Sequence, residues 1–222
     1  MTFAAQLIPA WLSNSLWLLM LLTCAACVRS ADWSALRQEP VRSHLLFGGT
    51  IACLVLCLIS VRIIDGLWIH FLGVTALTLI LGWRFAILAG SAAVVAHTLI
   101  IAQPLAAVSP AWLLTVAAPA TVSRWLVQRL RKLRSGNLFI YMLGAGFGGG
   151  ILSALIVALL ALLLLWISGQ QEWFEQAIAN WPMIFLLLFP EGFINGMLVT
   201  TLTVFYPDLV KTFDDRHYLA DG

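Results

Sequence analysis

Residues 66–83 read GLWIHFLGVTALTLILGW, an apolar stretch that carries one ionisable side chain, His70. The stretch approaches the length of about 20 apolar residues that crosses a bilayer as a helix. An imidazole in hydrocarbon costs free energy unless it faces the interior of a bundle, a partner or a ligand. We therefore interpret His70 as a functional residue. The alternative is a hydrogen bond to a neighbouring helix that serves packing alone.

The composition places the whole chain in a membrane. Of its 222 residues, 62% are hydrophobic and 10% are charged, whereas about a quarter of the residues in a soluble domain are charged. The apolar runs predict an all-α polytopic membrane protein, in which residues 1–222 form one domain of about seven transmembrane helices. The predicted spans cover about 8–28, 44–61, 67–81, 85–102, 111–127, 138–167 and 182–205. We expect the first span to be retained, because it lacks the basic flank of a signal peptide.

The distribution of Lys and Arg predicts the orientation of these spans. With the N-terminus outside and the C-terminus inside, all of the twelve basic residues except Arg62 fall on the cytoplasmic side. Such an asymmetry is typical of multi-pass proteins. An even number of spans would put one group of charges on the wrong side. The acidic loop with Glu172 and Glu175 then lies on the outer face.

Three ionisable side chains lie inside predicted spans: His70, His97 and Glu191. Two imidazoles and a carboxylate suit a late first-row divalent metal such as Ni²⁺ or Co²⁺. Asn195 shares a helix face with Glu191, because the two are four residues apart. A proton-coupled or organic-solute site, and purely structural hydrogen bonds, are the two alternatives that the residues leave open.

Four cysteines form two pairs on predicted helix faces, Cys24 with Cys27 and Cys53 with Cys57. Four thiolates would select Zn²⁺ or Cu⁺. Buried packing is the favoured interpretation, because Cys is a common small apolar core residue.

The most basic run, RWLVQRLRKLR at 124–134, has apolar residues at helical spacing. We expect it to lie in the membrane interface, where Arg129, Arg131, Lys132 and Arg134 contact anionic headgroups. Docking of a cytoplasmic partner is the alternative.

Glycine and proline patterns predict local features of the bundle. GAGFGGG at 144–150 contains two GxxxG spacings, and Gly192 with Gly196 forms a third, all of which favour close helix approach. Pro119 predicts a kink in the fifth span.

Catalytic motifs of soluble enzymes are missing from the sequence. It contains neither the GxxxxGK[ST] phosphate loop nor HExxH. We expect no enzyme activity, no nucleic-acid partner and no permanently bound cofactor. If ATP drives transport, another subunit must supply it.

Four stretches resemble a known family: LIPAWLS (7–13), IHFLGVTALTLILGWRFAILAG (69–90), FPEGFINGMLVTTLTVFYPDLV (189–210) and TFDDRHYL (212–219). The family is that of the CbiM/NikM-type substrate-binding components of energy-coupling factor (ECF) transporters, which take up cobalt or nickel. The chain is most similar to its divergent proteobacterial branch, labelled ECF ABC transporter permease. The resemblance implies a multi-pass protein of the bacterial inner membrane that works with a transmembrane coupling subunit and cytoplasmic ATPases.

The resemblance also implies roles for single residues. In the family, a histidine of the third span and the small residues after it form the metal site, which implies that His70 is a ligand and that Gly73 and Thr75 support the cavity. The family also uses its N-terminal amino group and a histidine at position two. Here we expect the opening segment to be displaced inward, with Leu7 where that histidine would fall. His97 or Glu191 then replaces the ligand, or the substrate differs. A scaffold subunit that kept the fold and lost the metal site is the alternative function.

Overall fold

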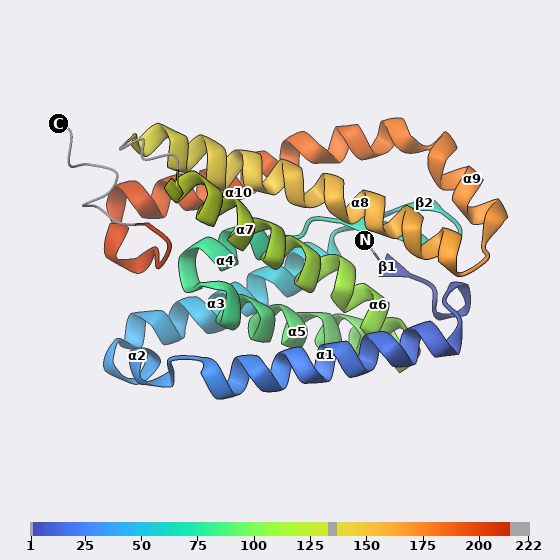
Figure 1. Ribbon diagram of the computed structural model, residues 1–222, viewed down its shortest axis with the longest axis horizontal. Helices are drawn as coiled ribbons and strands as arrows, with labels where there is room; N and C mark the ends of the chain where they lie inside the picture. Colours follow the sequence, from blue (N-terminus) through green and yellow to red (C-terminus); the bar gives the residue numbers. More distant parts are fainter. Residues whose placement is uncertain (1, 133–136, 214–222) are drawn as a thin grey trace.

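The computed structural model describes residues 2–132 and 137–213. Within these ranges six helices are long and apolar enough to cross a membrane. They run along the long axis of an elongated bundle (Figure 1). Their bounds are Ala10–Ser30, Pro40–Leu58, Trp83–Ile100, Leu105–Lys132, Ile140–Ile167 and Trp181–Phe205. The chain is thus an all-α polytopic membrane protein with six candidate transmembrane helices. Arg134 and the stretch after Phe213 lie outside the described residues.

Short helices connect the long ones at the two ends of the bundle. At one end α2 (Trp33–Gln38) joins α1 (Ala10–Ser30) to α3 (Pro40–Leu58). At the opposite end (Figure 1) α9 (Gln171–Ala179) joins α8 (Gly149–Ile167) to α10 (Trp181–Phe205). Single 3₁₀ turns are formed by η1 (Ala5–Leu7), η2 (Leu105–Ala107) and η5 (Pro207–Leu209).

The prediction of a transmembrane helix over 67–81 is wrong for the first half of that range. Strand β3 (Leu67–His70) precedes the short helix α4 (Val74–Leu81). In a three-stranded antiparallel sheet β3 lies between β1 (Thr2–Phe3) and β2 (Ser60–Ile64). The two flanking strands satisfy backbone groups that lipid would leave unpaired. The second predicted span, 44–61, likewise runs past the end of α3 into β2.

Gly73 makes the change from strand to helix. Its φ of +63° lies in the left-handed region, which an L side chain reaches only with strain. Every residue of α4 is buried, so the other helices enclose this short segment. A buried strand followed by a buried helix carries the same unbroken hydropathy as a single transmembrane helix, which is why the composition of 67–81 did not separate them.

The remaining predicted spans agree with long helices to within a few residues, except that the fifth helix begins earlier and ends later than 111–127. Helix α5 covers Trp83–Ile100. The fifth span runs from η2 through α6 (Val108–Trp112) and a π-helical turn η3 (Leu113–Ala117) into α7 (Ala118–Lys132). This π turn lies directly before Pro119, the residue at which we expect a kink, and proline lacks the N–H that a regular α-helix needs there. A second π segment, η4 (Ile140–Gly148), begins the sixth span.

Glycines set the close contact between the last two long helices. A Cβ on Gly150 would lie 2.9 Å from the carbonyl oxygen of Glu191 and 2.9 Å from Cα of Gly192. A Cβ on Gly146 would lie 3.2 Å from Cα of Gly196. The predicted role of GxxxG spacings in close helix approach is therefore confirmed for two of them, Gly146 with Gly150 and Gly192 with Gly196.

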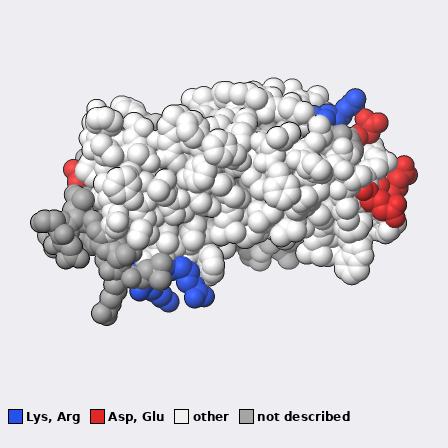
Figure 2. Space-filling model, turned by 90° about the horizontal axis from the view of Figure 1, so that it is seen from above, with Lys and Arg blue, Asp and Glu red and all other residues white. Residues whose placement is uncertain are grey.

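The outer faces of the bundle are apolar and its ends are charged. Helices α1 and α3 expose large apolar side chains such as Leu18, Leu22, Phe47 and Ile51, a pattern that suits contact with lipid. Figure 2 shows Lys and Arg mainly towards one end of the molecule and most Asp and Glu at the other. At the acidic end Arg62 is paired with Asp65 at 3.0 Å.

Candidate metal-binding site

His70 ends strand β3 and is almost completely enclosed, with 2% of its surface exposed. Its Nδ1 lies 3.0 Å from the carbonyl oxygen of Phe71. Because a carbonyl oxygen only accepts, Nδ1 carries the proton and Nε2 has the lone pair. Among the described residues Nε2 has no hydrogen-bond partner although it is buried. A buried polar atom without a partner costs free energy, so this nitrogen is suited to bind a ligand.

A second imidazole lies beside the first. His97 of α5 is buried, and its ring centroid is 6.1 Å from that of His70, with an angle of 46° between the rings. Metal–nitrogen bonds are about 2.0–2.1 Å long. Two rings at this separation can therefore hold one ion between them when a nitrogen of each faces the gap. The structure brings together these two residues of the predicted ligand set.

A cavity of about 210 Å³ adjoins His97 at the end of the bundle that carries the β2–β3 turn. Its lining residues come from the N-terminal strand, the ends of α3 and α5, and strands β2 and β3: Thr2, Leu58, Ser60, Trp68, His97, Ile101 and Gln103. The cavity thus adjoins one of the two buried histidines, His97, while His70 is not among its lining residues.

The N-terminal strand lies beside the strand that carries His70. The structure pairs Thr2 with Trp68 in that strand, and the expectation that Leu7 takes the position of the family's histidine stays a prediction. Leu7 packs near Gly66, where a Cβ would lie 2.9 Å from Leu7 Cδ1. Thr2, whose side chain carries a hydroxyl, also lines the cavity beside His97.

Glu191 takes a different place from the one predicted. Its Oε2 accepts a hydrogen bond from the N–H of Leu72 at 2.9 Å, and its Oε1 accepts one from the N–H of Gly73 at 3.3 Å. Asn195 donates to Glu191 Oε1 at 2.6 Å and accepts from the N–H of Ala76 at 2.8 Å. These two buried side chains of α10 thus satisfy free backbone donors at the start of α4.

This arrangement separates Glu191 from the histidine pair. In the part of the chain that the structure describes, no group of three His, Cys, Asp or Glu side chains is placed to hold a metal ion. The expected set of three ligands is therefore not assembled. Glu191 fixes the turn that directly follows His70, and so holds the candidate ligand in place.

The other predicted supporting residue, Thr75, belongs to a buried hydroxyl cluster. Its Oγ1 donates to Ser153 Oγ at 3.1 Å and accepts from Ser123 Oγ at 3.1 Å. The cluster ties α4 to α7 and α8. Sequence reasoning missed both serines, because a hydroxyl on an apolar helix gives no signal until the packing is known.

The cysteines form no disulfide among the described residues, and one of them makes a hydrogen bond. Cys24 Sγ lies 3.4 Å from Ser91 Oγ, and all four thiols are free. Cys53 packs beneath Gly73, where a Cβ would lie 3.6 Å from its sulfur.

Three of the four predicted headgroup-binding cations are described. Arg129 lies over the ring of Trp125 at 5.2 Å, and Arg131 donates to the carbonyl oxygen of Thr212 at 2.8 Å. Lys132 is exposed at the end of α7.

Comparisons with known proteins agree with this fold. The family model CbiM, described as cobalt uptake substrate-specific transmembrane region, matches residues 3–209. Two crystal structures are similar over almost the whole chain. One, described as a transition metal transporter, has a TM-score of 0.72 at 18% identity and covers 100% of both chains. The other, described as a truncated transition metal transporter, has a TM-score of 0.73 at 15% identity and covers 94% of this chain and 99% of its own. No curated protein matches the chain.

Proposed function

The chain belongs to the CbiM family of cobalt uptake substrate-specific transmembrane components, and from this premise we propose that it captures a divalent ion such as Co²⁺ or Ni²⁺ at His70. Membership makes it a multi-pass transport component and not an enzyme.

The observation that carries the proposal is the buried Nε2 of His70, which has no partner among the described residues. His97 lies at a distance that allows a shared ion. The hydroxyl of Thr2, a residue that lines the adjoining cavity, is the further oxygen donor that we assign to this site. Imidazole nitrogen is a good ligand for both Co²⁺ and Ni²⁺.

We further propose that the ion enters from the outer side of the bacterial inner membrane. The cavity beside His97 lies at the end that also carries α9, with Glu172 and Glu175. Arg84, Arg124, Arg131 and Lys211 lie at the opposite end. Cytoplasmic loops carry the excess of Lys and Arg, which supports an orientation with the N-terminus outside and the C-terminus inside. This orientation needs an odd number of crossings, so we propose that β3 and α4 together make the seventh beside the six long helices.

Energy for uptake then comes from other subunits. The sequence has no phosphate loop, and membership of the family implies the partners of an ECF transporter. We propose a transmembrane coupling subunit and cytoplasmic ATPases as these partners.

Titration calorimetry on detergent-purified protein tests the site. We expect saturable binding of Ni²⁺ or Co²⁺ that is lost in His70→Ala and kept in His44→Ala, because His44 is exposed on α3 at the far end of the bundle. Unchanged affinity in His70→Ala would exclude His70 as a ligand. Failure of the unaltered protein to bind Ni²⁺, Co²⁺, Zn²⁺ or Cu⁺ would favour the scaffold function instead.

A further inference from the structure

A cavity of about 310 Å³ opens at the basic end of the bundle, far from the histidine pair. Four cationic side chains line it: Arg84 from the start of α5, Arg124 and Arg131 from α7, and Lys211 from the segment after α10. The only carboxylate among its lining residues is that of Asp32. The basic run at 124–134 supplies two of the four cations, so the cavity joins charges from three separate parts of the chain.

Aromatic rings hold two of these cations at the cavity. The guanidinium of Arg124 lies 5.1 Å from the ring centroid of Trp83, and the ammonium of Lys211 lies 6.0 Å from that of Phe85. Cation–π contacts of this kind orient a charge without neutralising it. Both cations therefore stay available to an anion.

The segment that carries Lys211 is itself fixed. The backbone N–H of Lys211 donates to the carbonyl oxygen of Ile80 at 2.9 Å, and that of Thr212 donates to the carbonyl oxygen of Leu79 at 3.2 Å. These bonds satisfy carbonyls at the end of α4 that lack an intrahelical partner. The cavity is thus built on ordered backbone.

Among the described residues none of the four cations forms an ion pair, although the charge of Lys211 acts on Asp32. Within residues 2–132 and 137–213 the ion pairs are Arg42 with Glu39 and Arg62 with Asp65, none of which involves this cavity. Four cations and one carboxylate leave the lining with a net charge of +3. A cavity with this unbalanced charge favours an anionic ligand.

The one carboxylate of the cavity lining, that of Asp32, already accepts hydrogen bonds from α2. Asp32 Oδ1 accepts from the N–H of Ala35 at 3.3 Å and from Ser34 Oγ at 2.5 Å, and so caps α2. These hydrogen bonds lower the pKa of Asp32 below its usual value. The carboxylate stays ionised at neutral pH, and its hydrogen bonds are made with residues of α2.

The N-terminus of α5 also favours an anion in this cavity. No side chain caps this helix of 18 residues, and its first residues, Trp83, Arg84 and Phe85, line the cavity. The free N–H groups and the positive end of the helix dipole favour an anion.

We propose that this cavity binds a phosphate group, carried either by an anionic phospholipid headgroup or by a free phosphate compound. Arg and Lys pair strongly with phosphate oxygens. The tryptophan at the cavity marks the depth of the membrane interface, where lipid phosphates lie. The proposal does not depend on the metal site.

Thermal unfolding in nanodiscs tests the proposal and separates the two sources. The first arm compares nanodiscs of phosphatidylcholine alone with nanodiscs that also contain phosphatidylglycerol, with bound lipid counted by native mass spectrometry. The second arm titrates inorganic phosphate into the phosphatidylcholine nanodiscs. We expect a higher Tm in one arm, and affinity for that probe roughly 25-fold weaker in Arg84→Gln/Arg124→Gln, at about fivefold for each cation removed near a membrane surface.

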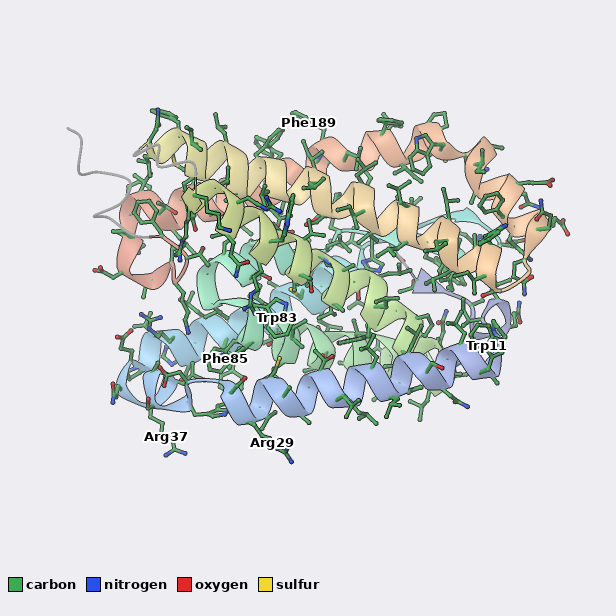
Figure 3. All side chains as sticks on the ribbon, in the orientation of Figure 1. Trp11, Arg29, Arg37, Trp83, Phe85 and Phe189 are labelled. Atoms are coloured by element: carbon green, nitrogen blue, oxygen red, sulfur yellow. The ribbon has the colours of Figure 1, made fainter. Side chains whose placement is uncertain are left out.

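Arg29→Gln/Arg37→Gln is the matched control, because it removes the same charge at the same end. Neither residue lines the cavity, and Figure 3 shows both side chains pointing away from the bundle. The single variant Arg84→Gln, at an exposed position, should show about fivefold weakening even if the double variant fails to fold.

A rise with phosphatidylglycerol alone identifies a lipid, and a rise with inorganic phosphate identifies a soluble phosphate compound. Equal losses in the cavity and control variants would overturn the proposal. So would no response to either probe, including the case in which only an acidic protein partner occupies the cavity.

Discussion

Glu191 and Leu72 are joined by a hydrogen bond of 2.9 Å between residues 119 positions apart in the sequence. The bond runs from the backbone N–H of Leu72 to the carboxylate on α10. Leu72 lies two residues after His70, so the carboxylate fixes the backbone that presents the candidate ligand. A charged acceptor at the start of α4 also interacts favourably with the helix dipole.

Replacing this carboxylate should loosen the turn. In Glu191→Gln one of the two oxygens becomes an N–H₂ group, which leaves a buried donor facing the N–H of Leu72 or Gly73. We expect a loss of about 1–3 kcal/mol in the free energy of unfolding, measured by denaturant unfolding in detergent, together with weaker Ni²⁺ binding. Glu172→Gln on α9 is the control, because Glu172 is exposed. Equal stability of the two variants would contradict this role.

Asn195 should act together with Glu191. It donates to the carboxylate at 2.6 Å and accepts from Ala76, so the two side chains form one network. In a double-mutant cycle of Glu191→Gln and Asn195→Ala we expect a coupling free energy of about 0.5–3 kcal/mol. Additive losses would show that the two residues work independently.

Gly73 should tolerate no side chain. In Gly73→Ala the left-handed backbone costs about 1–2 kcal/mol, and the new Cβ would lie 2.7 Å from Leu56 Cδ1. We expect a lower Tm in detergent. Gly48→Ala is the control, since a Cβ there meets nothing within 4 Å and alanine favours the helix. A stable Gly73→Ala protein would rule out this backbone requirement.

Two neighbouring glycines of α8 should respond differently. A Cβ on Gly150 meets the backbone of α10 at 2.9 Å, whereas one on Gly149 meets side-chain atoms at 3.5 Å. Gly150→Ala should destabilise the fold by about 1–3 kcal/mol, while Gly149→Ala should be neutral or slightly stabilising. Unfolding curves of the pair provide the measurement, and a reversed order would refute the close contact.

A substitution at Thr2 should strengthen metal binding. Its backbone pairs with Trp68, and it lines the cavity beside His97. Thr2→His adds an imidazole there, and nitrogen ligands strengthen binding of Ni²⁺ and Co²⁺. We expect tighter Ni²⁺ binding by calorimetry, with Thr2→Ser as the control. No gain would place position 2 outside the coordination sphere.

The sequence predicted much of the fold because long apolar helices carry a strong local signal. Helices α1 and α10, for example, begin and end within two residues of their predicted bounds. The third span was misassigned because β3 exists only through pairing with residues 2–3 and 60–64. Hydropathy has no access to such long-range partners.

The site was predicted in part for the same reason. His70 and His97 were identified by their cost in hydrocarbon, and the structure places them together. Glu191 carries the same signal, but its partners are backbone N–H groups far along the chain. The type of a buried residue shows that a partner is needed, and only the packing shows which one.

Helix α4 is clamped at both ends by the same C-terminal part of the chain. Glu191 and Asn195 hold its start, while the backbone of Lys211 and Thr212 holds its end. Moving α10 away from α4 would therefore require these hydrogen bonds to break. Because the strand that ends in His70 leads directly into α4, the same bonds connect the basic end of the bundle to the region of the histidine pair.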